Sequence, residues 1–461
     1  MKVAKSSANA RHRAIADVQF NDSAQSLTSF GGLVIFQPFF RAIGLRAGLQ
    51  ACFGHLDRKL SHYYNFGTLA QLLVVHMLLG YRKLRDSDYY RNDPLVLDLL
   101  GLRQLPSVPT MSRMLRRVDQ QALDNLRRYN SDQILERLQV EKLRRVTLDF
   151  DGSVLSTKRR AEGCAVGFNK QKKGARSYYP LFCTVAQSGQ IFDHLHRSGN
   201  VHDSNGAAEF VIRCVEEVRA ALGERTIIEV RMDSAFFSDE MVTVLKMLEV
   251  EFTISVPFER FVDLKNMITE RGRWWQLFGA EKKTSYFEKK WKPQCWEKKE
   301  RFVFICTETK KQSKEPVQLD LFEPVESGMD FKVIVTNKKG GTASVVKYHE
   351  GRGYQEKIFG EVKSQLPMGY IPCRRRMANE MYMQCAVLTH NLGRELQMSV
   401  EPRRLSPGVK RTAMWVFEGL GRLRGKIIQR AARLTWPQGK KTLTFADNPA
   451  LKADLQRFME A

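Results

Sequence analysis

Two aspartates end predicted strands in the middle of the chain, a position suited to metal chemistry. Asp151 ends the run from Val146, in which apolar and polar residues alternate, and Asp233 ends the largely apolar run from Thr226. Ligands of open α/β sheets gather at the carboxyl ends of strands. A divalent cation can balance the lost hydration of a carboxylate there, and hard oxygen ligands favour Mg²⁺ or Mn²⁺. A single Asp is more often a turn or helix-capping residue, so the predicted metal site depends on the pair.

A long helix, predicted from about Val345, supplies a third carboxylate. At ~100° per residue, one narrow stripe of this helix carries Tyr348, Arg352, Glu356 and Lys363. Charged stripes also arise as simple intrahelical ion pairs. Because this stripe follows two strand-end aspartates, we interpret it as part of a phosphodiester site. A metal at Glu356 would meet the reacting phosphate, while Arg352 and Lys363 would hold its neighbours.

The order of Asp151, Asp233 and Glu356 on these elements resembles the DDE transposases of bacterial insertion sequences. Within that superfamily the chain is most similar to members with a Tyr–Arg–Glu–Lys signature and a β-rich insertion ahead of the Glu. The long interval between Asp233 and Glu356 suits such an insertion. The resemblance covers roughly residues 30–400 and includes the segments Leu148–Ser153, Asp233–Phe237 and Ala386–Leu392.

The identity of the first acidic ligand stays open on pattern alone, because Asp149 and Asp151 face the same side of the predicted strand. The resemblance favours Asp151, since the small hydroxyl residue Ser153 follows two positions later, as in the family. It also implies two Mg²⁺ ions, for which Mn²⁺ can substitute. Asp151 would bridge both ions, while Asp233 and Glu356 would bind one each.

The resemblance further implies the reaction and the partners. Such an enzyme cleaves the ends of an insertion sequence and joins them to target DNA by phosphodiester hydrolysis and strand transfer. Tyr348, Arg352 and Lys363 would contact the DNA backbone. We expect the partners to be the terminal inverted repeats, target DNA and a second copy of the chain in a synaptic homodimer. A metal-dependent nuclease without strand transfer and a non-catalytic DNA-binding protein are the alternatives.

The elements around these residues predict an α/β fold, with an RNase H-like mixed sheet flanked by helices, a β-rich insertion, and helical N- and C-terminal regions. A helical DNA-binding region is expected first, followed by the first part of the catalytic domain, the insertion, the second catalytic part with the Glu-bearing helix, and a basic helical region. Their expected limits are residues 1–140, 141–256, 257–330, 331–398 and 399–461, respectively.

Two helices near the end of the N-terminal region carry clustered arginines. We expect Thr110 to cap the first helix, whose apolar stripe lies opposite Arg113, Arg116 and Arg117. The second helix is expected over Leu123–Leu138. Short basic helices joined by a tight turn suit a helix-turn-helix that reads DNA. A helical bundle with a solvated basic face is an equally good interpretation.

The composition favours a polyanionic partner, because 74 Lys and Arg oppose 50 Asp and Glu and give a net charge of +24. The polar first 28 residues lack the apolar core of a signal peptide, and no apolar run approaches the ~20 residues of a membrane span. Eight scattered cysteines without a C-x-x-C pair are typical of reduced thiols. We therefore expect a bacterial, nucleoid-associated protein of the cytoplasm. Without a P-loop motif, no nucleotide cofactor is expected.

Two further groups have competing interpretations. His194 and His196 would share one face of a strand and could bind a metal, but without a third ligand in view a polar strand face is the better interpretation. Tryptophans of the insertion could stack on a flipped base, although in a β-rich segment they more often form core. These are Trp274, Trp275, Trp291 and Trp296.

Overall fold

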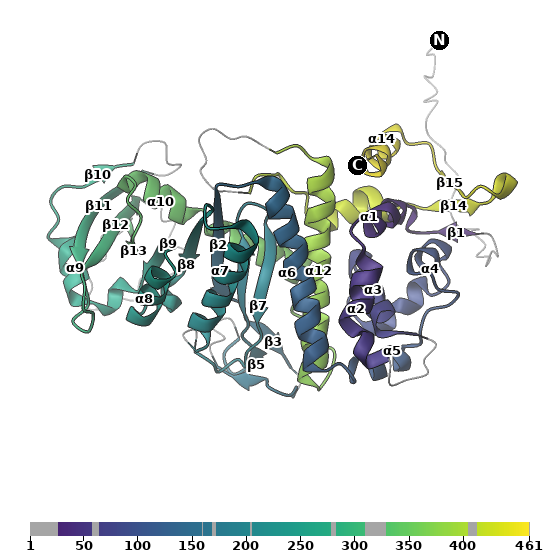
Figure 1. The fold of residues 1–461 in the computed structure, drawn as a ribbon, viewed down its shortest axis with the longest axis horizontal. Coiled ribbons are helices and arrows are strands. Elements are labelled where there is room, and N and C mark those ends of the chain that lie inside the picture. The colour runs from purple at the N-terminus through teal and green to yellow at the C-terminus, as the bar shows by residue number, and fades with distance from the viewer. Residues whose placement is uncertain are drawn as a thin grey trace, which may run out of the picture.

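The computed structural model shows an elongated α/β protein, with a sheet extension at one end, a mixed sheet in the middle and a helical region at the other end (Figure 1). The first 25 residues of the polar N-terminal segment lie outside the residues that it describes. Those residues are 26–57, 64–158, 160–167, 172–202, 205–277, 283–308, 329–403 and 413–460.

The middle of the nine-stranded sheet confirms the predicted mixed α/β core. Strands β2, β8 and β9 are parallel, whereas β6 and β7 continue the sheet beyond β2 in antiparallel pairing. Parallel pairing aligns the carboxyl ends of β2 and β8, where the candidate aspartates lie. The bounds are Arg145–Gly152 for β2, Leu181–Val185 for β6, Gln190–Leu195 for β7, Ile227–Met232 for β8 and Glu251–Val256 for β9.

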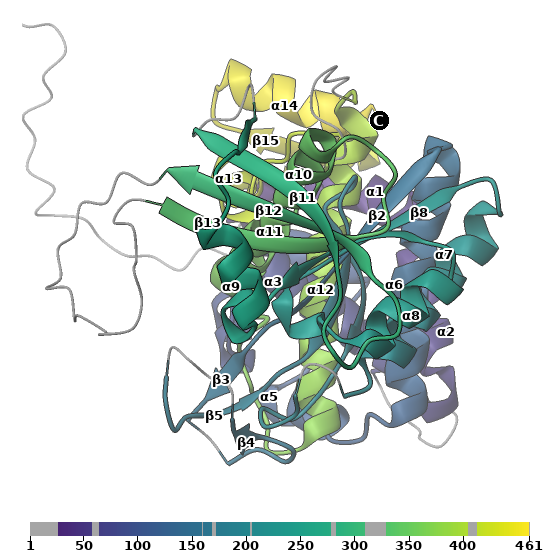
Figure 2. The same cartoon turned by 90° about the vertical axis from the view of Figure 1, so that its left-hand side faces the viewer.

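The β-rich segment after β9 extends the same sheet (Figure 2). Strand β13 pairs antiparallel with β9, with Val333 opposite Val256, and β12, β11 and β10 follow outward. Trp291 and Trp296 are buried against Phe302, so these two rings belong to the core rather than to a base-stacking surface. The bounds are Trp275–Gln276 for β10, Thr284–Trp291 for β11, Glu300–Glu308 for β12, Met329–Thr336 for β13 and Val262–Thr269 for helix α9.

The sheet lies between two apolar layers. One face of β2 presents Val146, Leu148 and Phe150 to α7 and α8. The opposite face, which carries the aspartates, is covered by α11 and α12, where Phe182 of β6 packs on Phe359 with ring centroids 5.2 Å apart. The bounds are Ala207–Leu222 for α7, Asp239–Met247 for α8, Thr342–Glu350 for α10, Gly353–Ser364 for α11 and Arg376–Val400 for α12.

The N-terminal helices share an apolar core with α11 and α12. Every residue of α3 is buried, and α3 packs against α12, which runs beside α6 (Figure 1). Ser107 rather than Thr110 caps α5, because its hydroxyl accepts the Thr110 N–H at 3.3 Å. The bounds are Phe36–Ala42 for α1, Leu45–Asp57 for α2, Phe66–Leu78 for α3, Pro94–Leu100 for α4, Val108–Leu115 for α5 and Gln120–Glu141 for α6.

The C-terminal region differs from the helical region that we expected, because it contributes two strands to a small antiparallel sheet with β1. Arg424 anchors this region, since its buried guanidinium donates to the carbonyls of Met77 and Leu78 at the end of α3, both at 2.7 Å. Among the described helices, none has the length and apolarity that a membrane crossing requires. The bounds are Leu27–Thr28 for β1, Leu420–Leu423 for α13, Ala432–Thr435 for β14, Thr442–Phe445 for β15 and Pro449–Met459 for α14.

Candidate active site

The register of β2 and β8 places Asp151 beside Asp233. Phe150 pairs with Met232 in the parallel ladder, and each aspartate is the residue that follows in the chain. Neighbouring strands are ~4.8 Å apart, and paired residues point to the same face. The Asp233 side chain accepts the Ala235 N–H at 3.0 Å, so it also caps the turn that follows β8. The structure therefore brings together two of the predicted ligands.

Asp149 is occupied by a buried ion pair, which favours Asp151 as the acid of β2 that can reach a ligand. The Asp149 side chain is 1% exposed and accepts from Nε and Nη2 of Arg231, the latter at 2.7 Å. Asp151 is 16% exposed and points to the same face. Sequence patterns could not separate the two acids, because the partner of Asp149 comes from another strand.

Arg352 lies between Asp151 and Glu356, the third predicted ligand. Its Nη1 is 3.3 Å from Oδ2 of Asp151, and its Nη2 is 3.5 Å from Oε1 of Glu356. Glu356 lies in the first turn of α11 and is 67% exposed, so its carboxylate can move while Asp151 is held by its strand. The guanidinium thus joins the Glu-bearing helix to the end of β2.

The electrostatics of this region show an excess of buried negative charge. Burial and the neighbouring Asp233 raise the pKa of Asp151 to about 7, with a smaller contribution from Glu356, whereas Arg352 opposes the rise. Burial lowers the pKa of Lys363, and Asp151 acts against that shift, so the ammonium group lies within the field of Asp151. Three carboxylates and two cations are therefore electrostatically linked at one edge of the sheet.

The residues present fit a divalent cation in their chemistry. Three carboxylates supply hard oxygen donors, and a cation would relieve the repulsion that raises the pKa of Asp151. Within the described part of the chain, no three His, Cys, Asp or Glu side chains are already close enough to hold an ion. Arg352 supplies positive charge between Asp151 and Glu356 in this arrangement.

The expected continuous helix is interrupted, and the single stripe from Tyr348 to Lys363 does not form. Helix α10 ends at Glu350 and α11 begins at Gly353. Across the junction the backbone makes tight bonds from residue i to residue i−3, such as Gln355 N to Arg352 O at 3.0 Å. Arg352, Glu356 and Lys363 stay close to Asp151, but Tyr348 belongs to a different helix.

Tyr348 does not have the position expected of a DNA contact. Its side chain is 2% exposed. The ring lies between Arg231 and Lys338, with the Lys338 ammonium 4.2 Å and the Arg231 guanidinium carbon 5.2 Å from its centroid. The backbone carbonyl of Tyr348 accepts from Nη1 of Arg231 at 2.8 Å. We therefore correct the expectation: Tyr348 supports the ion pair beneath the site.

Gln355 is a site residue that the sequence analysis missed. It is fully buried, and its side-chain amide donates to the backbone carbonyl of Asp149 at 2.9 Å. This bond fixes the start of α11 against β2, one residue before Glu356. A buried polar residue beside the acidic ligand is a signal that could have been noticed, but its partner carbonyl could not be inferred from sequence.

Glu380 of α12 is a second residue that the sequence did not connect with its neighbours. Its carboxylate oxygens are 3.7 Å from Nε2 of His194 and 3.6 Å from Nδ1 of His196, and all three side chains are buried. His194 is opposite Phe182, which is opposite Asp151, so this cluster lies on the same face as the acids. The two histidines therefore belong to a polar strand face whose partner is the Glu380 carboxylate of α12.

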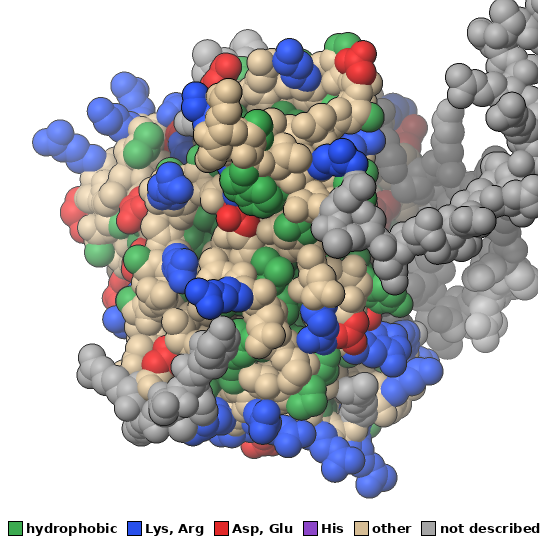
Figure 3. All heavy atoms as spheres, turned by 90° about the vertical axis from the view of Figure 1, so that its right-hand side faces the viewer, with side chains coloured by type: hydrophobic (Ala, Val, Ile, Leu, Met, Phe, Trp, Pro, Cys, Tyr) green, Lys and Arg blue, Asp and Glu red, His purple; other side chains and the backbone are tan. Residues whose placement is uncertain are grey.

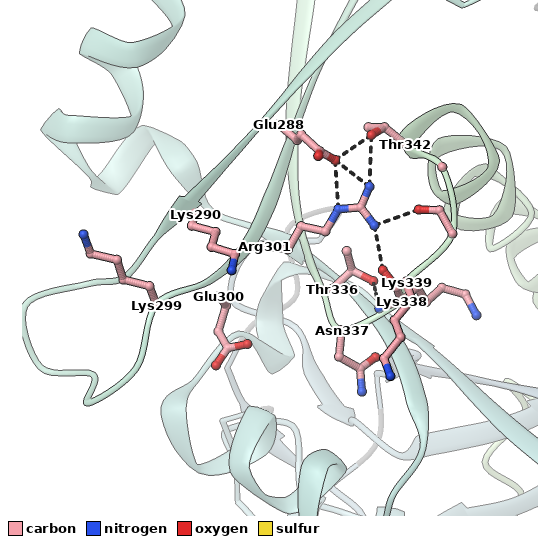
Figure 4. Close-up of a pocket in the computed structure, with 12 residues that line it drawn as sticks. Glu288, Lys290, Lys299, Glu300, Arg301, Thr336, Asn337, Lys338, Lys339 and Thr342 are labelled. Atoms are coloured by element: carbon pink, nitrogen blue, oxygen red, sulfur yellow. Dashed lines mark hydrogen bonds and ion pairs between the residues drawn. The ribbon is translucent and has the colours of Figure 1, made fainter.

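An open pocket of about 710 Å³ lies at the opposite edge of the sheet and is separate from the carboxylates (Figure 4). Lys338 marks this edge, since its ammonium pairs with Glu229 and Glu251 near the starts of β8 and β9. In the close-up, Arg301 is held by Glu288 and by the Thr342 hydroxyl at 3.0 Å. The saturated guanidinium indicates a structural role for this residue.

A mixed sheet with strand-end carboxylates beside a Glu-bearing helix is suited to metal-dependent phosphodiester chemistry. The chain belongs to the family "Transposase DDE domain group 1", whose model matches residues 11–461. It is a DNA transposase, which cleaves and joins DNA strands with the help of divalent metal. The family match carries this assignment.

Solved transposase structures show distant similarity to the chain. A synaptic complex of piggyBac transposase with hairpin DNA matches with 12% identity and a TM-score of 0.44, covering 84% of this chain and 78% of that one. A Mos1 mariner paired-end complex with Mn matches with 14% identity and a TM-score of 0.17, covering 37% of this chain and 56% of that one. A search of curated proteins returned no match.

Proposed function

We propose that Asp151, Asp233 and Glu356 form the catalytic centre of an insertion-sequence transposase and hold two Mg²⁺ ions, or Mn²⁺ in their place. The observation that carries the proposal is the register that sets Asp151 beside Asp233, with Glu356 joined to Asp151 through Arg352. When bound, the metals would activate the attacking water or 3′-hydroxyl and stabilise the leaving oxygen. The three carboxylates would hold the metal ions in place and thereby orient the scissile phosphate.

Arg352 and Lys363 bind the DNA backbone beside the scissile phosphate in this proposal. A guanidinium matches two phosphate oxygens at once, and an ammonium group adds a point charge. Both side chains are already near Asp151, as the 3.3 Å ion pair of Arg352 and the influence of Asp151 on the pKa of Lys363 indicate. Arg352 would leave the carboxylates when DNA and metal enter. Tyr348, which is buried, is left out of the DNA contacts.

The partners in this proposal are the terminal inverted repeats of the element, target DNA and a second copy of the chain in a synaptic homodimer. Two element ends must be handled together for joining, which suits one protomer for each end. Strand transfer exchanges one phosphodiester for another, so a nucleotide cofactor is not required. No disulfide joins the cysteines of the described residues, which supports work in the bacterial cytoplasm on nucleoid DNA.

Isosteric variants test the assignment. Asp151→Asn, Asp233→Asn and Glu356→Gln should each abolish Mg²⁺-dependent cleavage of a labelled duplex that carries the element end, while binding of that duplex persists. Glu240→Gln, a change at an exposed position of α8, is the matched control and should cleave normally. Cleavage that persisted in the three variants would refute the proposed centre.

Strand transfer needs a separate measurement. Pre-cut element ends with free 3′-hydroxyls are mixed with a supercoiled plasmid, and joined products are separated by electrophoresis. A transposase joins the ends to the plasmid in the presence of Mg²⁺. Hydrolysis of the duplex without any joined product would instead support a nuclease.

A further inference from the structure

Two arginine-rich segments, far apart in the sequence, meet on one surface. The guanidinium of Arg375 donates to the backbone carbonyl of Arg116 at the end of α5. This contact joins the arginines after Thr110 to the arginine run at the start of α12. The six exposed residues, which we name the arginine patch, are Arg113, Arg116, Arg117, Arg374, Arg375 and Arg376.

The backbone of the second segment is held in place by Glu162. The Glu162 N–H donates to the Arg374 carbonyl at 2.7 Å, and its carboxylate accepts the Arg376 N–H at 3.1 Å. The Arg376 guanidinium donates to the carbonyl of His196 at 2.9 Å. The Glu162 carbonyl accepts from the hydroxyl of Tyr178 at 2.5 Å. The patch is therefore built on ordered backbone that several elements share.

Three cations of the patch, Arg113, Arg116 and Arg374, are available to a ligand. Within the described residues, Arg113, Arg116 and Arg374 form no ion pair with a carboxylate, and the nearest side-chain contact of Arg113 is the Thr110 hydroxyl at 3.4 Å. Guanidinium groups without acidic partners repel one another unless an anion lies between them. This arrangement favours binding of a polyanion.

The patch lies on the same side of the molecule as the carboxylates. Strand β3, Leu155–Thr157, follows directly from the carboxyl end of β2 and pairs with β5, Arg176–Tyr178, whose Tyr178 contacts Glu162. Figures 1 and 2 both show β3, β5, α5 and the start of α12 at the lower end of the molecule. Figure 3 shows Lys and Arg side chains along the lower edge of the helical face.

We propose that the arginine patch binds the phosphate backbone of the element-end duplex whose strand is cut at Asp151. This inference rests on the proposed function, and it adds a docking surface outside the catalytic centre. A guanidinium group can donate two parallel hydrogen bonds to phosphate oxygens. Contacts to the DNA backbone fix the register of a duplex without reading its sequence. The two segments meet only in the folded chain, so the surface also ties the N-terminal helices to the cut site.

A binding assay without divalent metal tests the patch, because no cleavage can occur. The variant combines Arg116→Ala and Arg374→Ala, whose side chains make no ion pair within the described chain. The matched control combines Arg144→Ala and Arg225→Ala, two exposed arginines before β2 and β8, at the other edge of the sheet. The probe is a fluorescent duplex carrying the element end, titrated at several salt concentrations.

The patch variant should bind about a hundredfold more weakly at ~0.1 M salt, because each lost phosphate contact removes about tenfold, and the slope of log K against log salt should fall by about 2. The control should keep the affinity and slope of the unchanged protein. Replacing the same two residues with Lys should retain most of the slope, because charge is conserved.

Unchanged affinity and slope in the patch variant would overturn the inference. Normal binding of the element end, combined with a loss of joining to a target plasmid only, would also overturn it, since the surface would then serve target DNA. Failure of the unchanged protein to cleave in Mg²⁺ would instead refute the proposed function, while the metal-free binding result would still decide the patch.

Discussion

Asp149 and Arg231 face each other on the parallel strands β2 and β8, and their side chains form a two-point ion pair from which solvent is excluded. The remaining guanidinium nitrogen of Arg231 donates to the carbonyl of Tyr348 at 2.8 Å. One buried residue therefore connects both acid-bearing strands to the end of α10. The pair lies on the same face of the sheet as Asp151 and Asp233, two residues earlier in each segment.

Removing one partner of this pair should destabilise the protein strongly. Asp149→Asn leaves the Arg231 charge without its counter-ion, and breaking a buried pair typically costs about 3–5 kcal/mol. Urea unfolding, followed by circular dichroism, measures the change in the free energy of unfolding. The double variant Asp149→Leu with Arg231→Met should lose less than the sum of the single variants. Stability within ~0.5 kcal/mol of the unchanged protein would contradict the role assigned to this pair.

Replacing Arg352 should strengthen metal binding in the absence of DNA. Its guanidinium is 3.3 Å from Asp151 and 3.5 Å from Glu356, where it repels an entering cation and occupies the carboxylates. Two unit charges ~4 Å apart interact by about 1 kcal/mol in water and about 4 kcal/mol near a protein surface. Removal of the guanidinium charge in Arg352→Ala should therefore tighten Mn²⁺ binding at least about tenfold. Titration by electron paramagnetic resonance reports the free ion.

The control for Arg352 is Lys357→Ala, an exposed cation on the same helix. It should leave Mn²⁺ affinity nearly unchanged. Weaker Mn²⁺ binding by Arg352→Ala than by this control would show that the guanidinium organises the carboxylates rather than competing with the ion.

Gln355 should matter for both stability and rate. Gln355→Leu removes the side-chain hydrogen bond to the Asp149 carbonyl, and the net loss of one such bond is typically about 0.5–1.5 kcal/mol. The start of α11 would then be free to shift, so single-turnover cleavage should slow even where the variant is folded. Lys357→Leu makes a comparable change at an exposed position of the same helix and should do neither. Full cleavage activity in a folded Gln355→Leu variant would show that Gln355 does not position Glu356.

Buried histidines should make the fold labile in weak acid. Burial lowers the pKa of His76 and of His196 to about 4, and that of His349 and of His390 to about 3. The unfolded chain binds these protons near pH 6.5, so it holds more protons than the native chain between pH ~6.5 and ~4. Stability is therefore complete above pH ~6.5 and falls as the pH decreases through this range.

Thermal unfolding between pH 8 and pH 4 measures this loss. His76→Gln should flatten the dependence, because one of the shifted groups is gone. His55→Gln, at a partly exposed residue that pairs with Asp119, is the comparison. A melting temperature that stayed constant from pH 7 to pH 4.5 would contradict the expectation.

The sequence predicted the two acid-bearing strands well because their signal is local. The alternating pattern that ends in Asp151 and the apolar run that ends in Asp233 locate two strands. The order of the elements along the chain suggests which strands are neighbours. The ion pair of Asp149 with Arg231 was beyond reach, because it depends on the exact register of two strands. The resemblance favours Asp151 through Ser153, and the ion pair adds a physical reason, because it occupies the side chain of Asp149.

Two other differences between the expected and the observed elements had signals in the sequence. The C-terminal tail, rich in Lys and Arg, is predicted as a helical region, although Pro437 and Gly439 between strands β14 and β15 indicate a turn. The stripe through Tyr348 assumed an unbroken helix, whereas Gly351 and Gly353 flank Arg352 and favour a break. Counting residues along an ideal helix failed at that junction.

That junction supplies the last prediction. A Cβ added to Gly351 would lie 2.2 Å from Nη1 of Arg231, whereas a Cβ on Gly353 would meet nothing within 4 Å. Gly351→Ala must push the guanidinium away from Asp149 and Tyr348 or displace the turn that carries Arg352. We expect it to lower the melting temperature and to slow cleavage. Gly353→Ala, at the first residue of α11, should be neutral or slightly stabilising because Ala favours helix. Equal behaviour of the two variants in melting and cleavage would mean that close approach to Arg231 does not fix the position of α11.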